Sequence, residues 1–257
     1  MQYPEFQGKT AIFTGAASGM GLLTSQLFAE NGGNVVMADV NAEALYAAAD
    51  AINAKGVGRA TAVICDIRNY AEVTALRDLA VQTYGSIDLL ISFAGGTAVR
   101  CQKVDHEKYP EFPDVPIEVY DWGLDVNLKG PFYLAHACLA EMRKQRSGVI
   151  INIGSVTGVD GDSYGMDYPT AKSALMNGLT KSLAQYGAPY GIRVNCVSPG
   201  PVLTRPAMAK MQTMLGRAAE PKEIVDLILY LASDKGAFIT GANYMIDGGR
   251  SIMRTRT

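Results

Sequence analysis

Short runs of β-branched and apolar residues alternate along the chain with longer segments in which apolar residues recur every three or four positions. Runs of the first kind predict strands, and segments of the second kind predict amphipathic helices. The predicted strands are Lys9–Thr14, Asn34–Asp39, Arg59–Cys65, Ile87–Ser92, Gly148–Ile153, Ile192–Val197 and Asn243–Ile246. Because helices separate most of these strands, we expect an α/β protein with a mostly parallel seven-stranded sheet and helices on both faces.

The clearest helical period places small and apolar residues on one face, at Ala171, Ala174, Leu175, Gly178, Leu179 and Ser182. Its small side chains predict a close approach to another helix. Two segments, Gly96–Pro116 and Pro199–Pro221, fit the alternation poorly, and long irregular loops inside a compact domain are usually functional. No repeat, low-complexity tract or linker interrupts residues 1–257, so we expect one domain.

Composition narrows the class of protein. Hydrophobic residues make up 48% of the chain and charged residues 19%, as in globular proteins. A net charge of -2 gives no basic surface for nucleic acid, and no apolar run approaches the roughly 18 residues that cross a bilayer. We expect no signal peptide, and four scattered cysteines without a CxxC pair predict reduced thiols in a cytoplasmic protein. With two histidines we expect no metal site.

A glycine-rich stretch, Thr14-Gly15-Ala16-Ala17-Ser18-Gly19-Met20-Gly21, follows the first predicted strand. Glycine lets the backbone turn tightly and approach a pyrophosphate, and the amides at the start of the next helix then face the anion. The spacing is GxxxGxG rather than GxGxxG, and turns of similar composition also occur for purely structural reasons. Its place between a strand and a helix predicts a dinucleotide site.

The second predicted strand ends at Asp39, 18 residues after Gly21. A carboxylate there can accept hydrogen bonds from the adenosine ribose, and its charge repels a 2′-phosphate. Ser18 and Val40 stand where a basic residue would suit NADP, so NAD(H) is expected to be preferred over NADP(H). Asp66, after the third strand, is placed to meet the adenine amino group. For Asp39 the alternative is a helix N-cap or a turn aspartate, and for Asp66 it is a capping role at the next helix.

The pair Tyr168 and Lys172 forms the only YxxxK motif in the chain. Residues four apart share a helix face, so the ammonium can lie near the phenol. A tyrosine with a pKa of about 10 is a poor acid or base at neutral pH, and a nearby cation typically lowers that pKa by about 1–3 units. The pair therefore indicates proton transfer to or from an alkoxide, although such a spacing also arises by chance.

Two further polar residues fit the same chemistry. Ser155 lies just past the fifth strand, 13 positions before Tyr168, at the sheet edge where α/β proteins bind ligands. A hydroxyl there can stabilise developing charge on a substrate oxygen, and the alternative is an ordinary turn serine. Asn127 sits inside a predicted helix, where asparagine has poor propensity. It either kinks that helix, holds a water near Lys172, or is solvated.

These motifs occur in a familiar order, followed by Pro199-Gly200 with Thr204 and by Asp247-Gly248-Gly249. The chain resembles the NAD(P)-dependent short-chain dehydrogenase/reductase family over nearly its whole length, in the branch whose members have about this length. The resemblance implies a Rossmann-type doubly wound sheet and a homotetramer in which long helices pair between subunits.

The resemblance also implies roles for individual residues. Asn127 supports a water relay, Ser155 orients the substrate, Tyr168 is the acid/base, and Lys172 binds the nicotinamide ribose and depresses the tyrosine pKa. Val202 and Thr204 contact the carboxamide. The residues expected to contact the cofactor are Gly15, Ser18, Gly19, Met20, Gly21, Asp39, Val40, Asp66, Ile67, Ala94, Gly95, Tyr168, Lys172, Pro199, Gly200, Val202 and Thr204.

Three departures from the family pattern bear on the substrate. Ser92-Phe93 replaces the usual Asn-Asn before Ala94-Gly95, residues 96–116 form a longer segment than usual, and the loop after Thr204 is shorter. We expect the long segment to set substrate selectivity, and the alternative is a surface excursion or a subunit contact. Its candidate contacts for an anionic, polyhydroxylated or ring-bearing substrate are Arg100, Lys103, His106, Tyr109 and Phe112. Tail residues that add positive charge from a neighbouring subunit are Arg250, Arg254 and Arg256.

The expected function is reversible hydride transfer between NAD(H) and a small-molecule secondary alcohol or ketone, with the protein supplying orientation and proton transfer. A non-catalytic dinucleotide sensor is the alternative, but a sensor has no use for Tyr168 with Lys172. An enoyl reductase pattern spaces tyrosine and lysine by seven, and residue 165 is Gly165. An epimerase or dehydratase relative carries a larger C-terminal domain. The framework is shared by many substrate classes, so substrate and direction stay open.

Overall fold

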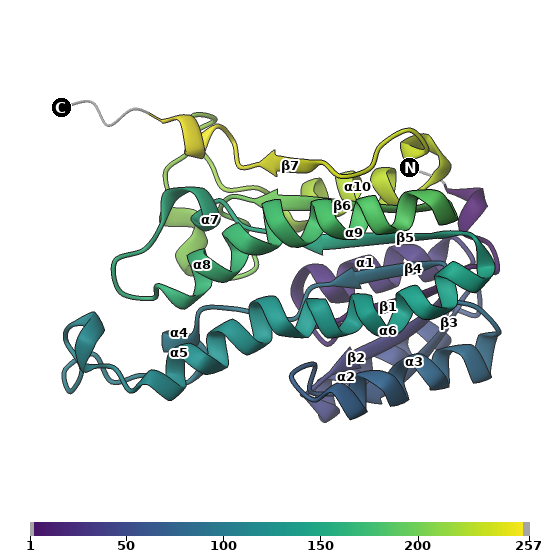
Figure 1. Cartoon of the computed structure of the whole chain (residues 1–257), viewed down its shortest axis with the longest axis horizontal. Helices are drawn as coiled ribbons and strands as arrows, with labels where there is room; N and C mark the ends of the chain where they lie inside the picture. Colours follow the sequence, from purple (N-terminus) through teal and green to yellow (C-terminus); the bar gives the residue numbers. More distant parts are fainter. Residues whose placement is uncertain (1–2, 254–257) are drawn as a thin grey trace.

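A computed structural model, which describes residues 3–253, arranges seven strands in one sheet in which all neighbouring strands are parallel. The strand order is β3-β2-β1-β4-β5-β6-β7 (Figure 1). The strands are β1 (Thr10–Thr14), β2 (Asn34–Asp39), β3 (Arg59–Ile64), β4 (Leu89–Ser92), β5 (Gly148–Ile153), β6 (Ile192–Pro199) and β7 (Asn243–Ile246). The predicted α/β class and all seven predicted strands are confirmed, with small differences at some strand ends.

Helices cover both faces of the sheet. The α-helices are α1 (Gly19–Glu30), α2 (Ala42–Asn53), α3 (Tyr70–Tyr84), α4 (Ala98–Cys101), α5 (Ile117–Leu124), α6 (Gly130–Gln145), α7 (Thr157–Asp160), α8 (Asp167–Ala174), α9 (Thr180–Gly187) and α10 (Pro221–Ala232). Helices α1, α2 and α10 pack on one face and α3, α6 and α9 on the other. This is a doubly wound Rossmann-type architecture.

The strands are apolar on both sides because both faces are covered. In β1, Ile12 packs in the core beneath α3 and α6, while Phe13 packs in the opposite core beneath α1. The ring of Phe13 meets Phe28 of α1 edge-on, with 5.6 Å between the ring centroids. Consecutive side chains of one strand therefore fill two separate cores, which is why the strands read as continuous apolar runs rather than alternating ones.

Local sequence signals start and stop the helices that follow the strands. The side chain of Asn41 accepts a hydrogen bond from the Ala44 amide at the start of α2, and Asn69 caps α3 through the Ala71 amide. Gly85 ends α3 in the left-handed region, with φ at 82°. Asparagine at an N-cap and glycine after the last turn are the favoured residues at these places.

Two long helical rods are each interrupted by one turn of π-helix. The first joins α5 to α6 through Asp125–Lys129, and the second joins α8 to α9 through Leu175–Leu179 (Figure 1). A π turn contains one residue more than an α-helical turn and is often found at functional sites. The hydrophobic period predicts the second rod as one regular helix, whereas a kink at Asn127 was among the explanations considered for the first.

The small and apolar residues of the second rod lie at both buried and exposed positions. Ala171 and Leu175 are buried, but Ala174 and Gly178 are exposed, and a Cβ built at Gly178 meets no atom within 4 Å. The close approach to another helix that these residues predict therefore stays a prediction.

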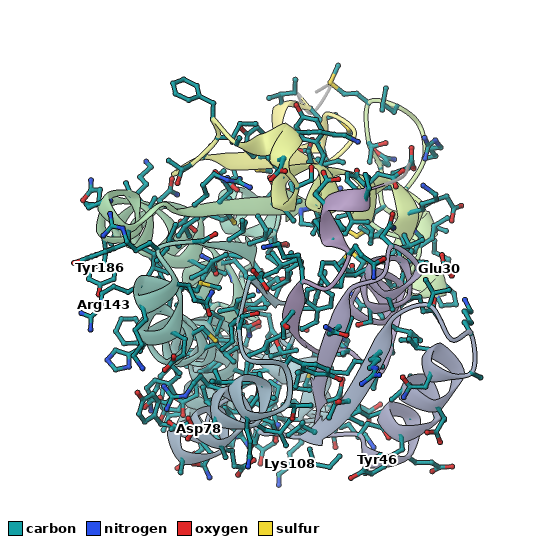
Figure 2. All side chains as sticks on the ribbon, turned by 90° about the vertical axis from the view of Figure 1, so that its right-hand side faces the viewer. Glu30, Tyr46, Asp78, Lys108, Arg143 and Tyr186 are labelled. Atoms are coloured by element: carbon teal, nitrogen blue, oxygen red, sulfur yellow. The ribbon has the colours of Figure 1, made fainter. Side chains whose placement is uncertain are left out.

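Polar side chains lie on the outer faces of the helices. Figure 2 shows Glu30 of α1 and Tyr46 of α2 at the edge of one face, and Asp78 of α3 and Arg143 of α6 at the edge of the other. Within residues 3–253, no helix is both long enough and apolar enough to cross a bilayer.

Candidate active site

The crevice at the carboxyl ends of the central strands brings together most of the predicted site residues. β1 lies between β2 and β4. The connection that follows β1 runs toward β2, and the connection that follows β4 runs the other way, toward β5. Open α/β sheets bind ligands at such a switch point. Helices α4, α5, α7 and α8 gather at this end of the sheet, toward which the β5 and β7 arrows point in Figure 1.

The glycine-rich turn joins β1 to α1 and can be built only with glycine at two of its positions. A Cβ on Gly15 would lie 2.8 Å from the Ala94 nitrogen, and a Cβ on Gly21 would collide with the Gly15 carbonyl oxygen. Gly15 and Gly19 also have positive φ values, 64° and 55°. Ser18, which precedes the helix, makes no capping bond with its side chain. The first amides of α1 are therefore not capped by the Ser18 side chain, and amides at such a helix start can bind an anion.

Asp39 ends β2 beside this turn. Its Oδ2 accepts a hydrogen bond from the Ala17 amide at 3.0 Å, and its Oδ1 accepts one from the Asn41 amide at 3.0 Å. The capping role considered for Asp39 belongs instead to Asn41. The next residue, Val40, is 68% exposed and neutral, so no cation at position 40 offsets the carboxylate.

Asp66 is held by a neighbour that the sequence analysis did not weigh. Its Oδ1 accepts hydrogen bonds from the Arg68 amide and from Arg68 Nε, both at 3.0 Å. The guanidinium of Arg68 lowers the pKa of the Asp66 carboxyl. The N-cap of α3 is Asn69 rather than Asp66. Ile67 is buried against Gly130 at the start of α6.

The stretch after β4 lies between the glycine-rich turn and the predicted catalytic residues. The Ala94 amide donates to Thr14 Oγ1 at 3.3 Å, and a Cβ on Gly95 would lie 2.5 Å from Asn127 Oδ1. Phe93 packs edge-on against Phe13, with 6.3 Å between ring centroids. Where the family has an asparagine pair, Ser92 Oγ is buried and has no hydrogen-bond partner among residues 3–253.

Tyr168, Ser155 and Lys172 come together as the sequence predicts. Tyr168 and Lys172 lie one turn apart on α8, with the Lys172 nitrogen 5.5 Å from the tyrosine ring centroid. Lys172 is buried and donates to the Ile153 carbonyl at 2.8 Å, just below the end of β5. Ser155 follows β5 and forms a side-chain hydrogen bond with the Tyr168 phenol. A phenol, a hydroxyl and an ammonium therefore converge at the carboxyl edge of the sheet.

The electrostatics of this group differ from the expectation. Burial raises the pKa of Tyr168, and the hydrogen bond from Ser155 offsets that rise only in part. Burial also lowers the pKa of Lys172 to about 8. Lys172 was expected to depress the tyrosine pKa, but in the protein alone desolvation outweighs every charge near the phenol. The phenol therefore stays protonated at neutral pH.

Asn127 lies in the first π turn and is fully buried. Its Oδ1 accepts from the Gly96 amide at 3.0 Å, and its Nδ2 donates to the Gly96 carbonyl at 2.8 Å and the Gly123 carbonyl at 2.9 Å. Of the three explanations considered for Asn127, a solvated helix residue is wrong. Its side chain pins the backbone after β4 to the distorted helix.

The segment after β6 lies over the glycine-rich turn. Pro199 is the last residue of β6, and its carbonyl accepts a hydrogen bond from the Val156 amide at 2.9 Å. Gly200 has no room for a side chain, because a Cβ there would lie 2.6 Å from the Asp247 Cα. The Thr204 methyl lies 3.6 Å from a Cβ built on Gly19.

Val202, in the same segment, is buried and forms an isolated parallel bridge with Ala219. Only a short 3-10 helix, Pro206–Lys210, follows Thr204 before α10. The segment that was expected to be a short lid is therefore tethered at its base and carries little regular structure beyond it.

The segment 96–116 contains α4 and a 3-10 turn at Phe112–Asp114. Its outer part packs on the loop that precedes α8: the Tyr164 hydroxyl donates to the Tyr109 carbonyl, and His106 stacks on Tyr164 with centroids 4.8 Å apart. Phe112 packs on Tyr120. These aromatic side chains bind the segment to the body of the protein, so only α4 at its beginning is left near Tyr168.

Two functional candidates were missed by the sequence analysis. Asp167, next to Tyr168, is buried beneath α4 and accepts from the Ala98 amide at 3.3 Å, and burial raises its pKa. Arg205, directly after Thr204, lowers the pKa of Tyr168 by its positive charge. Neither belongs to a recognisable motif. An aspartate beside the tyrosine of a YxxxK pair was the only signal that pointed to either residue.

Of the three C-terminal arginines that were expected to add positive charge from a neighbouring subunit, Arg250 lies within the described residues. Arg250 forms an ion pair with Asp160 of α7, with 3.3 Å between Nε and Oδ2, and its Nη1 donates to the Gln212 carbonyl at 3.0 Å. Its charge is therefore used within its own chain. Arg254 and Arg256 lie outside the described residues.

Comparison with known proteins defines the class to which this site belongs. A family model described as "Enoyl-(Acyl carrier protein) reductase" matches residues 15–251. The chain is 38% identical over 253 residues to a trans-4-hydroxycyclohexanecarboxylate dehydrogenase of Sinomonas cyclohexanicum, covering 95% of this chain and 93% of the relative. It is 36% identical over 264 residues to the oxidoreductase UcpA of Salmonella typhimurium, covering 95% of both chains.

The fold has a matching relative among solved structures. A 3-oxoacyl-[acyl-carrier protein] reductase with bound NAD from Brucella melitensis superposes with a TM-score of 0.86 at 30% identity, covering 98% of this chain and 94% of the other. Together with the crevice and the Ser155, Tyr168 and Lys172 cluster, these matches place the chain in a class of dinucleotide-binding oxidoreductases. The chain belongs to the short-chain dehydrogenase/reductase family.

Proposed function

We propose that this protein is an NAD(H)-dependent oxidoreductase that interconverts a secondary alcohol and a ketone, with Tyr168 as the general acid and base. The observation that carries the proposal is the meeting of the Tyr168 phenol with the Ser155 hydroxyl above the buried ammonium of Lys172. Relatives of this chain bear the names of enzymes that act on a hydroxy acid and on 3-oxoacyl groups, both of which match an alcohol and ketone pair.

The crevice fits a nicotinamide dinucleotide on structural grounds. Side chains at Gly15 or Gly21 would collide with the backbone of the first turn or of the stretch after β4, and one at Gly95 would collide with Asn127, so glycine is needed for the backbone shape that a pyrophosphate requires. The residues proposed to hold the dinucleotide are the predicted set from Gly15 to Thr204, with Asp39 at the adenosine ribose and Lys172 at the nicotinamide ribose. The bound nicotinamide supplies hydride transfer, and the protein supplies position and proton transfer.

The side chains have distinct tasks in the proposed reaction. In ketone reduction, the Tyr168 phenol donates its proton to the substrate oxygen, which agrees with the protonated state that its raised pKa favours. Ser155 donates a hydrogen bond to the same oxygen and stabilises its developing charge. Asn127 is a positioning residue, because it fixes the Gly96 backbone through two hydrogen bonds. In alcohol oxidation the phenolate takes the proton back.

Cofactor choice gives the first test. The Asp39 carboxylate beside an uncharged, exposed Val40 is expected to repel a 2′-phosphate. We expect kcat/KM to be at least about tenfold higher with NAD(H) than with NADP(H), a difference of about 1.4 kcal/mol. Asp39→Ala should narrow this gap, and Val40→Arg in addition should narrow it further. Equal use of both cofactors by the wild type would contradict the role given to Asp39.

The long segment gives a second test. We expect that trimming Gln102–Asp114 to a short turn lowers kcat/KM for the best substrate by at least about tenfold, because misplaced groups near the chemistry cost this much or more. The trimmed region supports the loop before α8 through Tyr164, whose hydroxyl contacts the Tyr109 carbonyl. NADH affinity and the unfolding temperature serve as controls. An unaltered substrate profile in a folded, NADH-binding protein would make the segment a surface feature.

Two other functions are separated from this one by simple measurements. A dinucleotide-binding sensor would bind NADH without consuming it in the presence of a panel of ketones. An enoyl reductase, the description borne by the matching family model, would oxidise NADH with a 2-enoyl thioester instead. Residue 165 is Gly165, so the tyrosine seven positions before Lys172 that this reaction's pattern requires is missing. Absorbance at 340 nm follows both assays.

We also propose a cytoplasmic homotetramer. The cysteines Cys65, Cys101, Cys138 and Cys196 are all free thiols, as expected in a reducing compartment. The tetramer follows from the family resemblance, in which long helices pair between subunits. Light scattering of the purified protein measures the assembly directly.

A further inference from the structure

Two arginines stand near the Tyr168 phenol on separate loops of the crevice. Arg100 belongs to α4 after β4, and Arg205 follows Thr204 after β6. The positive charges of both lower the pKa of Tyr168, and the charge of Arg100 lowers the pKa of Arg205. The phenol and the two guanidinium groups therefore lie within electrostatic reach of one another.

The backbone holds each arginine in its place. The Arg100 guanidinium packs against Gly96, where a side chain would collide with it. Asn127 pins Gly96 through its amide and its carbonyl. A Cβ on the preceding residue, Gly95, would lie 3.7 Å from the Lys172 nitrogen. The Arg100 guanidinium therefore packs on Gly96, whose direct neighbour in the chain, Gly95, faces the Lys172 ammonium.

Arg205 approaches from the cofactor side of the crevice. The residue before it, Thr204, lies with its methyl 3.6 Å from a Cβ built on Gly19 in the glycine-rich turn. The buried bridge between Val202 and Ala219 fixes the base of this loop. The two arginines consequently approach Tyr168 from two different elements of the fold.

Neither charge is neutralised by the protein. Within residues 3–253, Arg100 and Arg205 take part in no ion pair, and Arg205 contacts only the Met208 sulfur, at 3.6 Å from its Nη2. By contrast, Arg217 at the foot of the same loop is paired with Glu223. Both unpaired arginines are solvent-exposed. Two like charges near each other are unfavourable until an anion lies between them.

We propose that Arg100 and Arg205 bind a carboxylate of the substrate, so that the enzyme acts on a hydroxy acid and its oxo acid. The proposal rests on the alcohol and ketone chemistry proposed above and adds the anionic group. A guanidinium binds a planar carboxylate through two parallel hydrogen bonds, which suits a pair of arginines at a site that must also orient a carbinol carbon. The hydroxy acid and NAD⁺ become the oxo acid, NADH and a proton, while the carboxylate is unchanged.

The groups that face this site are consistent with a carboxylate. The nearest ionisable neighbours of the pair are the Tyr168 phenol and the Cys101 thiol, and both are uncharged when protonated. The buried carboxyl of Asp167 accepts from the Ala98 amide, and the carboxyl of Asp162 accepts from the Tyr164 and Gly165 amides. Within residues 3–253, no carboxylate forms an ion pair with Arg100 or Arg205.

The test compares an acid with its uncharged analogues. 4-Hydroxycyclohexanecarboxylate and 3-hydroxybutyrate are assayed with NAD⁺ beside their methyl esters and primary amides. We expect kcat/KM for the better acid to exceed that of its ester by at least about tenfold, the scale of a charge-assisted contact. Arg100→Gln and Arg205→Gln should each remove about that factor for the acid through KM, with a smaller loss on the ester, which responds only to the altered charge near Tyr168.

The matched control is Arg59→Gln. Arg59 is exposed at the amino end of β3, the sheet edge opposite the site, and its substitution should leave both substrates unaffected. Equal kcat/KM values for acid and ester, or equal losses on both in the two site variants, would overturn the proposal. A loss of NADH affinity in Arg205→Gln would also overturn it, because the arginine would then serve the dinucleotide.

The remaining measurements distinguish a failure of the carboxylate site from a failure of the proposed alcohol and ketone chemistry. sn-Glycerol 3-phosphate tests a phosphate in place of the carboxylate, and a preference for it that both variants abolish would overturn the carboxylate assignment. If the wild type oxidises no alcohol and reduces no ketone, the proposed function fails. The arginine pair is then decided by titrating benzoate and benzamide into the protein with NADH. Tighter binding of benzoate that both variants lose supports the pair, and equal binding of the two overturns it.

Discussion

Tyr168→Phe is expected to lower kcat by at least about a hundredfold while NADH still binds with nearly wild-type affinity. The substitution removes the one proton that the phenol donates and leaves the ring, which packs over Lys172 at 5.5 Å, in place. Ser155 loses its hydrogen-bond partner in the phenol but keeps the Thr157 amide, which donates to its Oγ at 3.2 Å. Stopped-flow turnover and NADH fluorescence titration measure the two quantities separately.

Tyr46→Phe is the matched control. Tyr46 is 52% exposed on α2, and Figure 2 shows it at the edge of the molecule. Loss of its hydroxyl should change neither turnover nor binding. The assignment of Tyr168 as acid and base fails if its phenylalanine variant retains more than a few per cent of the wild-type rate.

Lys172→Ala is expected to reduce both the rate and the affinity for NADH, the affinity by at least about tenfold, because charge-assisted hydrogen bonds are the strong ones. The ammonium is proposed to contact the nicotinamide ribose and to stabilise the deprotonated phenol. The variant also leaves the Ile153 carbonyl without the donor that lies 2.8 Å away. Its unfolding temperature is therefore measured beside NADH affinity. An unchanged affinity in a folded variant would argue against the ribose contact.

The pH dependence of NADH binding tests the same contact. Burial lowers the pKa of Lys172 to about 8, below its ordinary value, so the charged form is lost as pH rises through that range. NADH affinity of the wild type should fall above pH 8, and Lys172→Ala should show no such fall. The stability of the protein without cofactor should change in the opposite sense. Between the pKa of about 8 in the folded protein and the higher ordinary pKa of a lysine, the unfolded chain holds more protons than the folded protein. The stability of the cofactor-free protein therefore rises with pH in this range.

Lys55→Ala is the control for charge alone. Lys55 pairs with Glu30 on the surface, with 2.7 Å between Nζ and Oε1, and lies after α2 away from the crevice. Surface pairs of this kind contribute little to stability. Its removal should leave NADH affinity and its pH dependence unchanged.

Most of the fold follows from patterns that are local in the sequence. The apolar runs mark all seven strands because both faces of a parallel sheet are buried. The glycine-rich turn could be placed because the tight approach of Gly15 to Ala94 tolerates no side chain. The order of the strands was not predicted, since a strand run does not itself show which strands lie beside it.

The parts of the site that the sequence did not show depend on contacts between distant residues. Asn127 could be recognised as unusual in a helix, but its bonds to Gly96 and Gly123 require the π turn. Arg205 has no motif of its own and becomes notable only beside Arg100 and Tyr168. The direction of the Tyr168 pKa was misjudged because burial is a property of the folded chain.

The two π turns limit how this chain can change in length. Deleting one residue from Leu175–Leu179 would restore a regular helix and leave later residues on their present faces, because a π turn accommodates one residue more than an α-helical turn. Thr180, which is buried and bonded to Asn152 at 3.0 Å, would then stay in the core, and Ala184 with it. Tyr168 and Lys172 precede the turn and would keep their places. A single-residue deletion within this π turn therefore spares the packing of α9, whereas one in α8 would rotate every later residue of the rod by about 100° and remove that packing.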